Sequence, residues 1–392
     1  MNVRHAVPAL AAAAVLAGCA GGTRAAPATP GTPHSAPTAP TATAPTAPSP
    51  AAQSPAPSKP SAAATPHGTL LVADFGADTV TFVDPDPGHD RRTLGSVEVG
   101  TAPYGLVVDD NGSAWVATAE GVAVVDTATR TRLARIPYET RTGPVTTGEY
   151  RGGGMGIALA PDGRHVYVGV NVPGRNGVLE IIDTASRKVT DTVPVGRRPF
   201  DVDVSPDGTE VYATGHDSFD VTAVNTSSRR TRRYEVAPYG TEGGLGSWLK
   251  PHYAVVRPAD GRLLLPFEGE RLVVLDPRTG RSTIERMTAD THQHGATLAP
   301  DGTLLVVGTG PILSDDKGPS LTVRTPGGSE RVVPLDGPHE DVTVSADSRT
   351  AYVTEGFTRD GYGNGITVVD LTGRKRPFEL VAGARPLGIA IL

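Results

Sequence analysis

Two stretches of the chain repeat one pattern and decide the fold: residues 156–170 read GIALAPDGRHVYVGV and residues 201–215 read DVDVSPDGTEVYATG. Each stretch has a short apolar run, a Pro-Asp-Gly turn and a second apolar run. Turn residues between two runs rich in β-branched and aromatic side chains are typical of two antiparallel strands joined by a tight turn. Each stretch therefore predicts a β-hairpin.

Less regular copies of this pattern occur along most of the chain. The copies begin at positions 105, 156, 201, 254, 295, 341 and 388, so successive starts lie 41 to 53 residues apart. A third apolar run, such as GVAVVDT at 121–127, and a more polar fourth run follow each hairpin. This spacing is typical of one four-stranded propeller blade per repeat. No segment carries a helical period over three turns, so the sequence predicts an all-β fold.

The two ends of the repeat region complement each other. The last copy, GIAIL at 388–392, supplies only a first strand, whereas the region opens at 67 with a second, a third and a fourth strand. Together these segments make one blade, and their pairing would close the ring and leave no free sheet edge. We therefore predict a seven-bladed β-propeller over residues 67–392, closed by strands from both ends.

The repeat resembles the YVTN-type (YncE-like) propeller repeats of bacterial surface and periplasmic proteins. The resemblance rests on PDGRHVYVGV and PDGTEVYATG, and on the strand starts VGTAPYGLVV at 99–108 and VGRRPFDVDV at 195–204. It implies the propeller fold, but propellers of this kind serve as binding platforms, electron-transfer partners and lactone-opening enzymes. The chain is also similar, more weakly, to propeller-type periplasmic zinc chaperones, although it has no His-rich arm.

The segment before the repeats predicts a membrane anchor and a tether. Residues 1–18 have a basic start and a short apolar run, and Leu-Ala-Gly-Cys at 16–19 matches a lipobox. These features indicate a lipoprotein signal peptide with lipidation of Cys19, the only cysteine of the chain. Residues 19–66 are almost entirely Ala, Pro, Thr, Ser and Gly, a composition that predicts a disordered linker. We therefore expect an extracytoplasmic lipoprotein, anchored to the outer face of the cell membrane.

The charge balance argues against nucleic acid as a partner. The chain has 36 Lys and Arg against 42 Asp and Glu, a formal net charge of −6. Asp and Glu outnumber Lys and Arg within the repeat region, a balance that disfavours binding to phosphate backbones. The expected partners are instead the membrane, through the lipid, and a metal ion, a small ligand or an extracytoplasmic protein.

Many acidic residues belong to the repeat itself. Three lie in Pro-Asp-Gly turns, and others end the third strand of each unit, usually before Thr or Pro. Because one turn-capping role explains every copy, we predict that both sets are structural: Asp162, Asp207 and Asp301, and Asp84, Asp126, Asp183, Asp276 and Asp370 with Asn225.

The histidines, in contrast, gather where the repeats differ. His252, the pair His292 and His294, and His339 precede the first strands of three successive blades, and His216 lies in a neighbouring second-to-third hairpin. In a propeller these positions lie on one face. Two imidazoles two residues apart on an extended segment point to the same side, which suits zinc or copper.

Carboxylates at equivalent positions could complete a mixed shell of nitrogen and oxygen ligands. The candidates are Glu340, Glu268 and Glu355. Two alternatives stay open: a site for an organic ligand or a peptide without metal, and a polar channel mouth whose histidines bond to strand ends. Two long connections, 139–153 and 237–250, should overhang the same face, and their neighbourhood offers candidate ligand or partner contacts: Tyr150, Arg151, Trp248, Lys250 and Tyr253.

Three functions fit this pattern. The first is a non-catalytic binding platform whose His-rich face takes zinc, copper, a small ligand or a partner. The second is a lactonase-like or lyase-like enzyme that uses His252, His294 or His339 with Glu268 and Arg151 as acid, base and anion contact. The third is a purely structural docking module. The sequence has no CxxCH haem motif and no GxSxG nucleophile motif.

Overall fold

The computed structural model describes residues 68–86, 93–236, 250–267, 269–289, 291–310, 317–356 and 363–392. The predicted signal peptide, Cys19 and the predicted linker lie outside the described residues. Within the described part no helix is long and apolar enough to cross a membrane.

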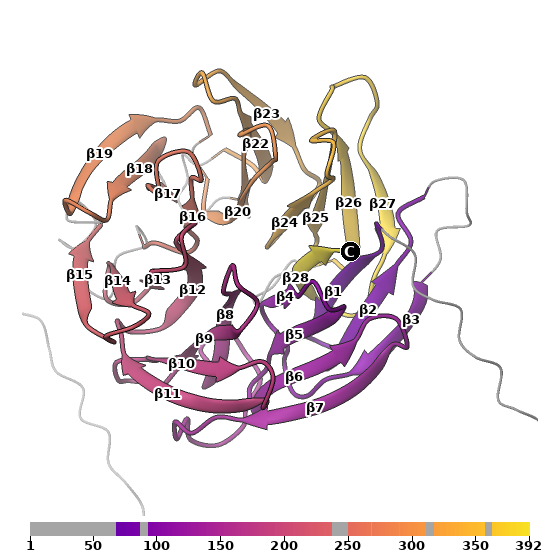
Figure 1. Cartoon of the computed structure of the whole chain (residues 1–392). Helices are drawn as coiled ribbons and strands as arrows, with labels where there is room; N and C mark the ends of the chain where they lie inside the picture. The colour runs from indigo at the N-terminus through magenta and orange to yellow at the C-terminus, as the bar shows by residue number, and fades with distance from the viewer. Residues whose placement is uncertain are drawn as a thin grey trace, which may run out of the picture. The chain divides into compact units, whose positions relative to one another are not determined.

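The described residues form seven four-stranded antiparallel sheets, arranged as blades around a ring (Figure 1). The predicted all-β, seven-bladed propeller is confirmed. From the inner to the outer strand, blade 1 comprises β28 (Pro386–Ile391), β1 (Leu70–Asp74), β2 (Thr79–Val83) and β3 (Thr93–Glu98); blade 2 comprises β4 (Leu106–Val108), β5 (Ser113–Ala117), β6 (Gly121–Asp126) and β7 (Thr131–Pro137); blade 3 comprises β8 (Gly153–Leu159), β9 (His165–Asn171), β10 (Val178–Asp183) and β11 (Lys188–Pro194).

The remaining blades follow the same plan. Blade 4 comprises β12 (Pro199–Val204), β13 (Glu210–Gly215), β14 (Asp220–Asn225) and β15 (Thr231–Glu235); blade 5 comprises β16 (Val255–Val256), β17 (Leu263–Phe267), β18 (Arg271–Asp276) and β19 (Arg281–Arg286); blade 6 comprises β20 (Gln293–Leu298), β21 (Leu304–Gly308), β22 (Ser320–Arg324) and β23 (Glu330–Pro334); blade 7 comprises β24 (Val342–Val344), β25 (Thr350–Thr354), β26 (Gly365–Asp370) and β27 (Phe378–Val381).

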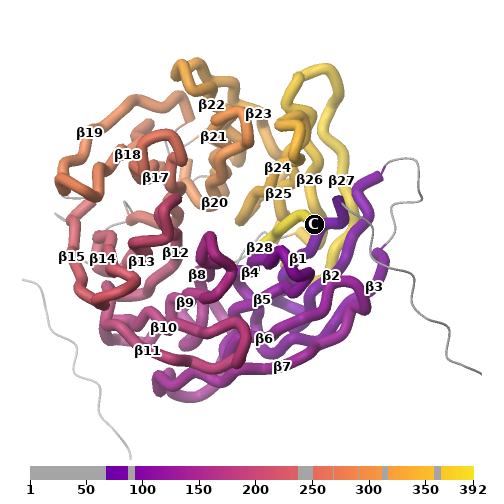
Figure 2. Tube along the Cα trace, viewed as in Figure 1, coloured from indigo at the N-terminus to yellow at the C-terminus, as the bar shows by residue number. Residues whose placement is uncertain are grey.

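The ring closes as the sequence predicts. The last strand, β28, pairs antiparallel with β1, with Leu71 opposite Ala390 and Val72 opposite Ile389. The indigo start and the yellow end of the propeller accordingly lie side by side in Figure 2. The side chain of Asp74 adds to this closure, because its Oδ1 accepts a hydrogen bond of 2.9 Å from the backbone N–H of Gly383.

Each pair of neighbouring blades buries its own apolar cluster. Tyr212 and Val221 of blade 4, for example, pack with Leu263 and Leu265 of blade 5. Apolar residues in the middle strands face both ways, so each sheet contributes to the clusters on either side. This burial between blades holds the ring together.

The packing between blades explains why six of the seven units begin with Gly or Asp. A Cβ at Gly156 would lie 2.5 Å from the Cα of Asp201, and one at Gly295 would lie 2.6 Å from the Cα of Asp341. Glycine is therefore required at these two positions, where the inner strand closely approaches that of the next blade. The carboxylate of Asp201 in turn accepts a hydrogen bond of 2.8 Å from the backbone N–H of Ala254 in the following blade.

The predicted structural role of the recurring acids is confirmed. The turn residues accept hydrogen bonds from backbone N–H groups two positions further on, and the residues that end the third strands accept them two or three positions further on. This holds for Asp162, Asp207, Asp301, Asp84, Asp126, Asp183, Asp276, Asp370 and Asn225.

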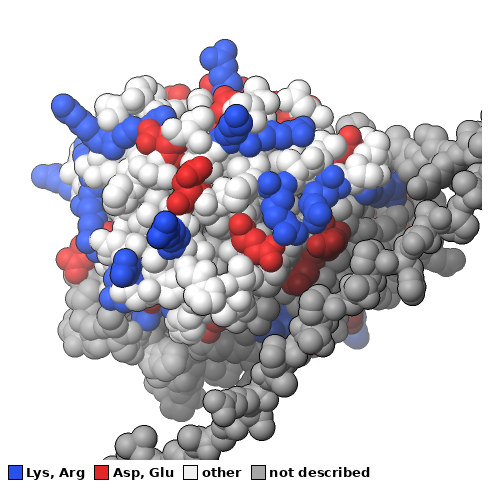
Figure 3. Space-filling model, turned by 90° about the horizontal axis from the view of Figure 1, so that it is seen from below, with Lys and Arg blue, Asp and Glu red and all other residues white. Residues whose placement is uncertain are grey.

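Ion pairs link the outer parts of adjacent blades. Arg229 of blade 4 contacts Asp191 of blade 3 at 2.7 Å, and Arg324 of blade 6 contacts Glu285 of blade 5 at 2.6 Å. The side of the propeller in Figure 3 accordingly shows acidic and basic side chains interspersed.

Seven equivalent positions, one before the start of each repeat, face one another at the centre of the ring. Apolar and aromatic side chains occupy most of these positions, and two adjacent blades carry polar ones instead. In blade order they are Leu387, Tyr104, Met155, Phe200, Tyr253, His294 and Glu340. Five of them pack in one cluster with Phe75 and Ala102, which we call the central plug. The two polar residues, His294 and Glu340, lie beside this plug and next to the other histidines of blades 4 to 6.

Candidate metal centre

Four of the five predicted histidines meet at the centre of the propeller. His216 lies in the hairpin between β13 and β14, His252 precedes β16, His292 precedes β20 and His294 lies within β20. Three successive blades thus supply the cluster, and each of the four residues is only 3% or 4% exposed.

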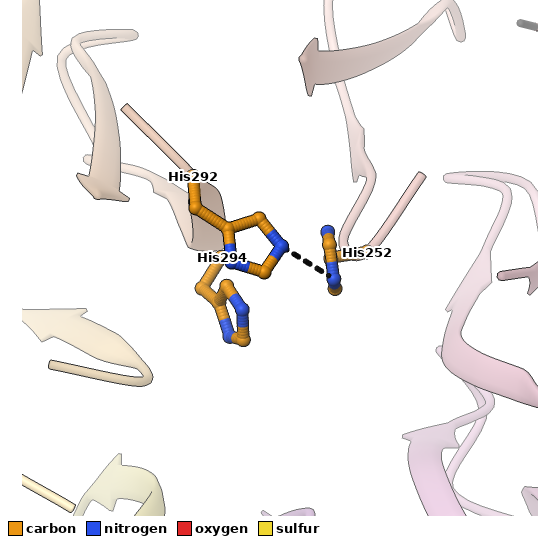
Figure 4. A group of neighbouring side chains, drawn as sticks. All are labelled: His252, His292 and His294. Carbon is orange, nitrogen blue, oxygen red and sulfur yellow. Dashed lines mark hydrogen bonds between the residues drawn. The ribbon is translucent and has the colours of Figure 1, made fainter. Parts of the chain in front are cut away.

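The imidazole rings are in direct contact. The ring centroids of His252 lie 4.6 Å from His216, 4.5 Å from His292 and 4.4 Å from His294, and those of His292 and His294 are 4.5 Å apart. Figure 4 shows His292 and His294 on one segment with His252 facing them. The prediction that His292 and His294 point to the same side is therefore confirmed.

The nitrogens are too crowded for hydrogen bonding alone. The Nε2 atom of His252 lies 3.1 Å from the Nε2 atom of His216 and 3.1 Å from that of His292. A neutral ring nitrogen carries either one proton or one lone pair, so His252 Nε2 can make only one of these two contacts as a hydrogen bond. A cation between the rings would satisfy all three nitrogens at once.

The spacing fits a transition metal. Ligand atoms of His252, His292 and His294 all lie within 4.8 Å of one another. With Zn–N bonds of about 2.0–2.1 Å, a tetrahedral site places its nitrogens about 3.3 Å apart, close to the two separations of 3.1 Å. Imidazole nitrogens are typical ligands of zinc and copper, so either predicted metal fits the residues present.

Two of the rings are held by carboxylates. His294 Nδ1 lies 2.9 Å from Glu340 Oε2, and His216 Nδ1 lies 2.8 Å from Asp217 Oδ1. In the tautomer that donates its Nδ1–H to the carboxylate, each ring keeps its Nε2 lone pair for a metal. This carboxylate–histidine arrangement is the usual outer support of metal-binding imidazoles.

Glu340 also joins the site to the central plug. Its Oε1 accepts hydrogen bonds from the Tyr104 hydroxyl at 2.8 Å and from the Tyr253 hydroxyl at 3.4 Å. Glu340 is fully buried. The sequence predicted Glu340 as a metal ligand. In the structure it orients His294 instead, because one oxygen contacts the His294 ring and the other accepts hydrogen bonds from the two tyrosines.

The electrostatics favour neutral rings. Burial lowers the pKa of His216 to about 4, against the opposing effect of its hydrogen bond with Asp217. Burial and the surrounding imidazoles hold the pKa of His252 well below its usual range. At neutral pH both rings are therefore uncharged, the form that binds a metal.

Asp217 is the charged support on the other side. Burial opposes its ionisation, but the hydrogen bond from His216 and the charges of Arg198 and Lys250 hold its pKa below the ordinary value. Arg198 Nη2 lies 3.1 Å from Asp217 Oδ2 and Lys250 Nζ lies 3.1 Å from Asp217 Oδ1. The carboxylate is thereby fixed against the His216 ring.

Two predicted ligands lie apart from the cluster. The ring of His339 is held by the Gly337 carbonyl at 2.6 Å and by the Thr367 hydroxyl at 2.8 Å. That hydroxyl donates to Glu355 Oε1 at 2.9 Å. His339 and Glu355 thus belong to a separate group in blade 7, because the His339 ring bonds within its own blade.

The remaining predicted contacts have different surroundings. Tyr150 is 52% exposed and stacks on the Arg198 guanidinium at 3.6 Å, Lys250 pairs with Asp217 as above, and Tyr253 bonds to Glu340. Arg151, expected on an overhanging loop, is instead buried and donates to the Ala102 carbonyl. Its guanidinium holds the plug neighbourhood in place. Trp248 and Glu268 lie outside the described residues.

Two charged members of the site, Asp217 and Arg198, are not among the candidate ligands and contacts predicted from the sequence. Asp217 directly follows His216 in its hairpin, and the adjacency of a carboxylate to a candidate ligand was the available signal. Arg198 stands before the proline of VGRRPF, where the blade 2 repeat has Ala102. A departure from the repeat at that position could have marked it.

No protein-family model matches the chain, and no curated protein sequence matches it. Solved structures, in contrast, are similar to it. The chain is similar to a functionally unknown protein from Desulfotomaculum acetoxidans, with a TM-score of 0.60, 11% identity and coverage of 83% of this chain and 98% of that one.

It is also similar to the periplasmic gluconolactonase of Pseudomonas aeruginosa, with a TM-score of 0.56, 14% identity and coverage of 83% and 99%. A third match is virginiamycin B lyase from Staphylococcus aureus with quinupristin, with a TM-score of 0.54, 16% identity and coverage of 82% and 92%. At such low identities the likeness shows the fold alone.

Proposed function

We propose that this chain is a non-catalytic metal-binding lipoprotein that holds zinc or copper outside the cell. The propeller supplies a rigid frame, the histidine cluster supplies the ligands, and the lipid on Cys19 ties the chain to the membrane. The proposal combines the cluster with the lipobox at residues 16–19.

One observation carries the metal part. Ligand atoms of His252, His292 and His294 lie within 4.8 Å of one another in a buried site. Buried polar groups normally have hydrogen-bond partners, yet His252 Nε2 faces two other ring nitrogens at 3.1 Å. A metal explains why three successive blades place imidazoles at one point.

The ligand set suits binding and release. Three imidazoles leave a fourth position, which His216 or a group from outside the chain can take. Carboxylates that fix the rings preorganise the site. A site of this kind can hold a metal firmly and still exchange its fourth ligand.

The metal content of the purified protein tests this proposal. The chain is incubated with zinc or copper, desalted and measured by elemental analysis. We expect about one metal per chain, and a large loss in the double variant His292→Ala, His294→Ala. His165→Ala, a histidine on β9 away from the cluster, is the matched control and should retain the metal. Absence of bound metal in the unaltered protein, or equal retention in the double variant, would overturn the proposal.

The anchor has its own test. Cells that produce the Cys19→Ala variant should release the protein from the membrane fraction, since the thiol that carries the lipid is missing. Equal membrane association of the variant and the unaltered chain would contradict lipid anchoring while leaving the metal site untouched.

A second candidate function is the opening of a cyclic ester. The observation that favours it is the hydrogen-bonded chain from His294 through Glu340 to the Tyr104 hydroxyl, which could move a proton beside a metal-bound substrate. The zinc-loaded protein is assayed with a panel that includes aldonolactones. Turnover no faster than in buffer would exclude these substrates.

A further inference from the structure

Arg198 lies directly beside the histidine cluster. It precedes β12, and its carbonyl accepts a hydrogen bond of 3.0 Å from the backbone N–H of His216. Its Nη2 pairs with Asp217, and its charge lowers the pKa values of both His216 and His252. The guanidinium is thus part of the surroundings of the cluster.

The guanidinium is buried with one donor unused. Arg198 is 3% exposed, and its Nη1 atom has no hydrogen-bond partner among the described residues. The ring of Tyr150 covers it at 3.6 Å. A buried guanidinium N–H without an acceptor is costly, so the site is incomplete without a further acceptor.

The repeat itself does not require this side chain. Ala102 in blade 2 and Arg385 in blade 1 stand at the equivalent position, and all three residues share the same left-handed backbone, with φ of 51°, 52° and 49° for Ala102, Arg385 and Arg198. Arg385 places its guanidinium over Phe75 at 5.2 Å. The architecture therefore accepts alanine, and Arg198 is free to serve the site.

The charge balance indicates what the missing acceptor is. Arg198 and Lys250 face three carboxylates near the site: Asp217, which contacts both cations, Glu149, which acts electrostatically on Arg198, and Glu340, which holds His294. A divalent metal on the neighbouring imidazoles would add two further positive charges. An anion next to Arg198 would balance this surplus and supply the acceptor that Nη1 lacks.

We propose that Arg198 binds an oxyanion, a carboxylate or a phosphate group of a small ligand, beside the metal held by the histidine cluster. The metal half of this site rests on the proposed function, whereas the arginine half stands on the unused Nη1 donor alone. The natural ligand is thus a small anionic compound, and the metal and the anion should support each other's binding.

Calorimetric titration with acetate and with inorganic phosphate tests this subsite. The full chain is used in its metal-free form and after zinc loading, with the variants Arg198→Gln, Arg198→Lys and, as the matched control, Arg385→Gln. We expect one of the two anions to bind, more tightly to the zinc-loaded form. Arg198→Gln should weaken binding at least tenfold, Arg198→Lys should weaken it less, and Arg385→Gln should leave it unchanged.

The outcomes separate the two proposals. Anion binding that Arg198→Gln and Arg198→Lys leave unchanged, or no anion binding to either form of the unaltered protein, overturns the subsite. If zinc fails to bind but an anion binds with the expected dependence on Arg198, the metal proposal fails and the subsite stands. If Arg198→Gln does not fold, Arg198→Lys decides the test. Lysine keeps a positive charge beside Asp217 but lacks the second guanidinium nitrogen that would donate to the anion.

Discussion

At the scale of single residues, His252 is the centre of the site. Its Nε2 atom makes both nitrogen contacts of 3.1 Å, and its ring touches the three other imidazoles. His216 contacts the His252 ring but does not belong to the trio His252, His292 and His294, whose ligand atoms lie within 4.8 Å of one another. The two rings should therefore contribute unequally to metal binding.

Substitution of His252 by alanine should remove most of the metal affinity, because one ligand is lost and the remaining nitrogens lose their common neighbour. His216→Ala should weaken binding by about 10–100-fold, as expected for a supporting residue. Competition with a chelator of known affinity measures both. Equal losses in the two variants would show four equivalent ligands, and no loss in His252→Ala would contradict the assigned site.

The carboxylates behind the rings should also matter. Glu340→Gln and Asp217→Asn keep the shape of the side chains. They remove the negative charge and so weaken the hydrogen bonds to the Nδ1 atoms of His294 and His216. Each change should lower metal affinity about 10–100-fold, measured by the same chelator competition. Asp162→Asn, in an exposed turn, serves as control. Unchanged affinity in both carboxylate variants would mean that the rings are positioned by packing alone.

The sequence could predict the ligands but not their partners. The repeat places His216, His252, His292 and His294 on one face, and this much follows from their positions. Ring orientation does not follow. His339 has the same repeat position as His252, yet the Thr367 hydroxyl and the Gly337 carbonyl hold its ring elsewhere, and no sequence pattern gives such local hydrogen bonds.

At the scale of elements, the closing blade depends on a buried carboxylate. Asp74 Oδ2 accepts hydrogen bonds from Thr79 at 2.9 Å and from Thr81 at 2.5 Å, and its Oδ1 accepts one from Gly383. Burial nonetheless raises its pKa to about 6. The folded state therefore keeps a proton that the unfolded chain releases at the ordinary aspartate pKa of 3.8.

The protein should lose stability as the Asp74 carboxyl ionises. As pH rises from about 4 to about 6, ionisation of Asp74 costs the folded state about 3 kcal/mol relative to the unfolded chain. Asparagine cannot ionise. The free energy of unfolding of Asp74→Asn should therefore increase relative to that of the unaltered protein as pH rises from about 4 to about 6. Urea unfolding at several pH values measures the difference, and a constant difference would contradict the raised pKa.

Asp74→Ala separates charge from hydrogen bonding. Alanine leaves two hydroxyls and the Gly383 N–H without their acceptor, and each lost buried partner costs about 1–3 kcal/mol. The alanine variant should thus be several kcal/mol less stable than the asparagine variant at pH 7. Similar stability of the two variants would show that water replaces the carboxylate.

The elements themselves were largely predictable. Hairpin turns and strand order follow from the repeat, because the same backbone approach recurs between blades. The seven equivalent positions at the centre of the ring show the limit of prediction from sequence. The polar pair His294 and Glu340 could be placed at equivalent positions, but their hydrogen bond and the tyrosine hydroxyls that join it depend on side-chain rotamers.

At the scale of the whole propeller, closure rests on the last strand. Removing residues 386–392 deletes β28, which exposes the edge of β1 and opens the apolar cluster between blades 7 and 1. We expect the shortened chain to lose cooperative thermal unfolding and to aggregate. Removal of residues 20–59 in the predicted linker is the control and should leave the melting temperature unchanged. Cooperative unfolding of the chain without β28 would contradict its closing role.

The ring also explains how distant segments form one site. His216 and His294 are 78 positions apart in the chain, and the Glu340 carboxylate that orients His294 comes from the next blade. The closed arrangement brings these groups from blades 4 to 7 to one centre. Metal binding should accordingly depend on the intact ring.

X-ray absorption spectroscopy of the zinc-loaded protein tests the central claim most directly, since it counts the imidazoles around the metal. We predict three or four nitrogen ligands at about 2.0–2.1 Å with the outer-shell scattering of histidine rings, and one imidazole fewer after His292→Ala. A shell of oxygen ligands without ring scattering, or a spectrum that His292→Ala leaves unchanged, would contradict a metal centre at the heart of the propeller.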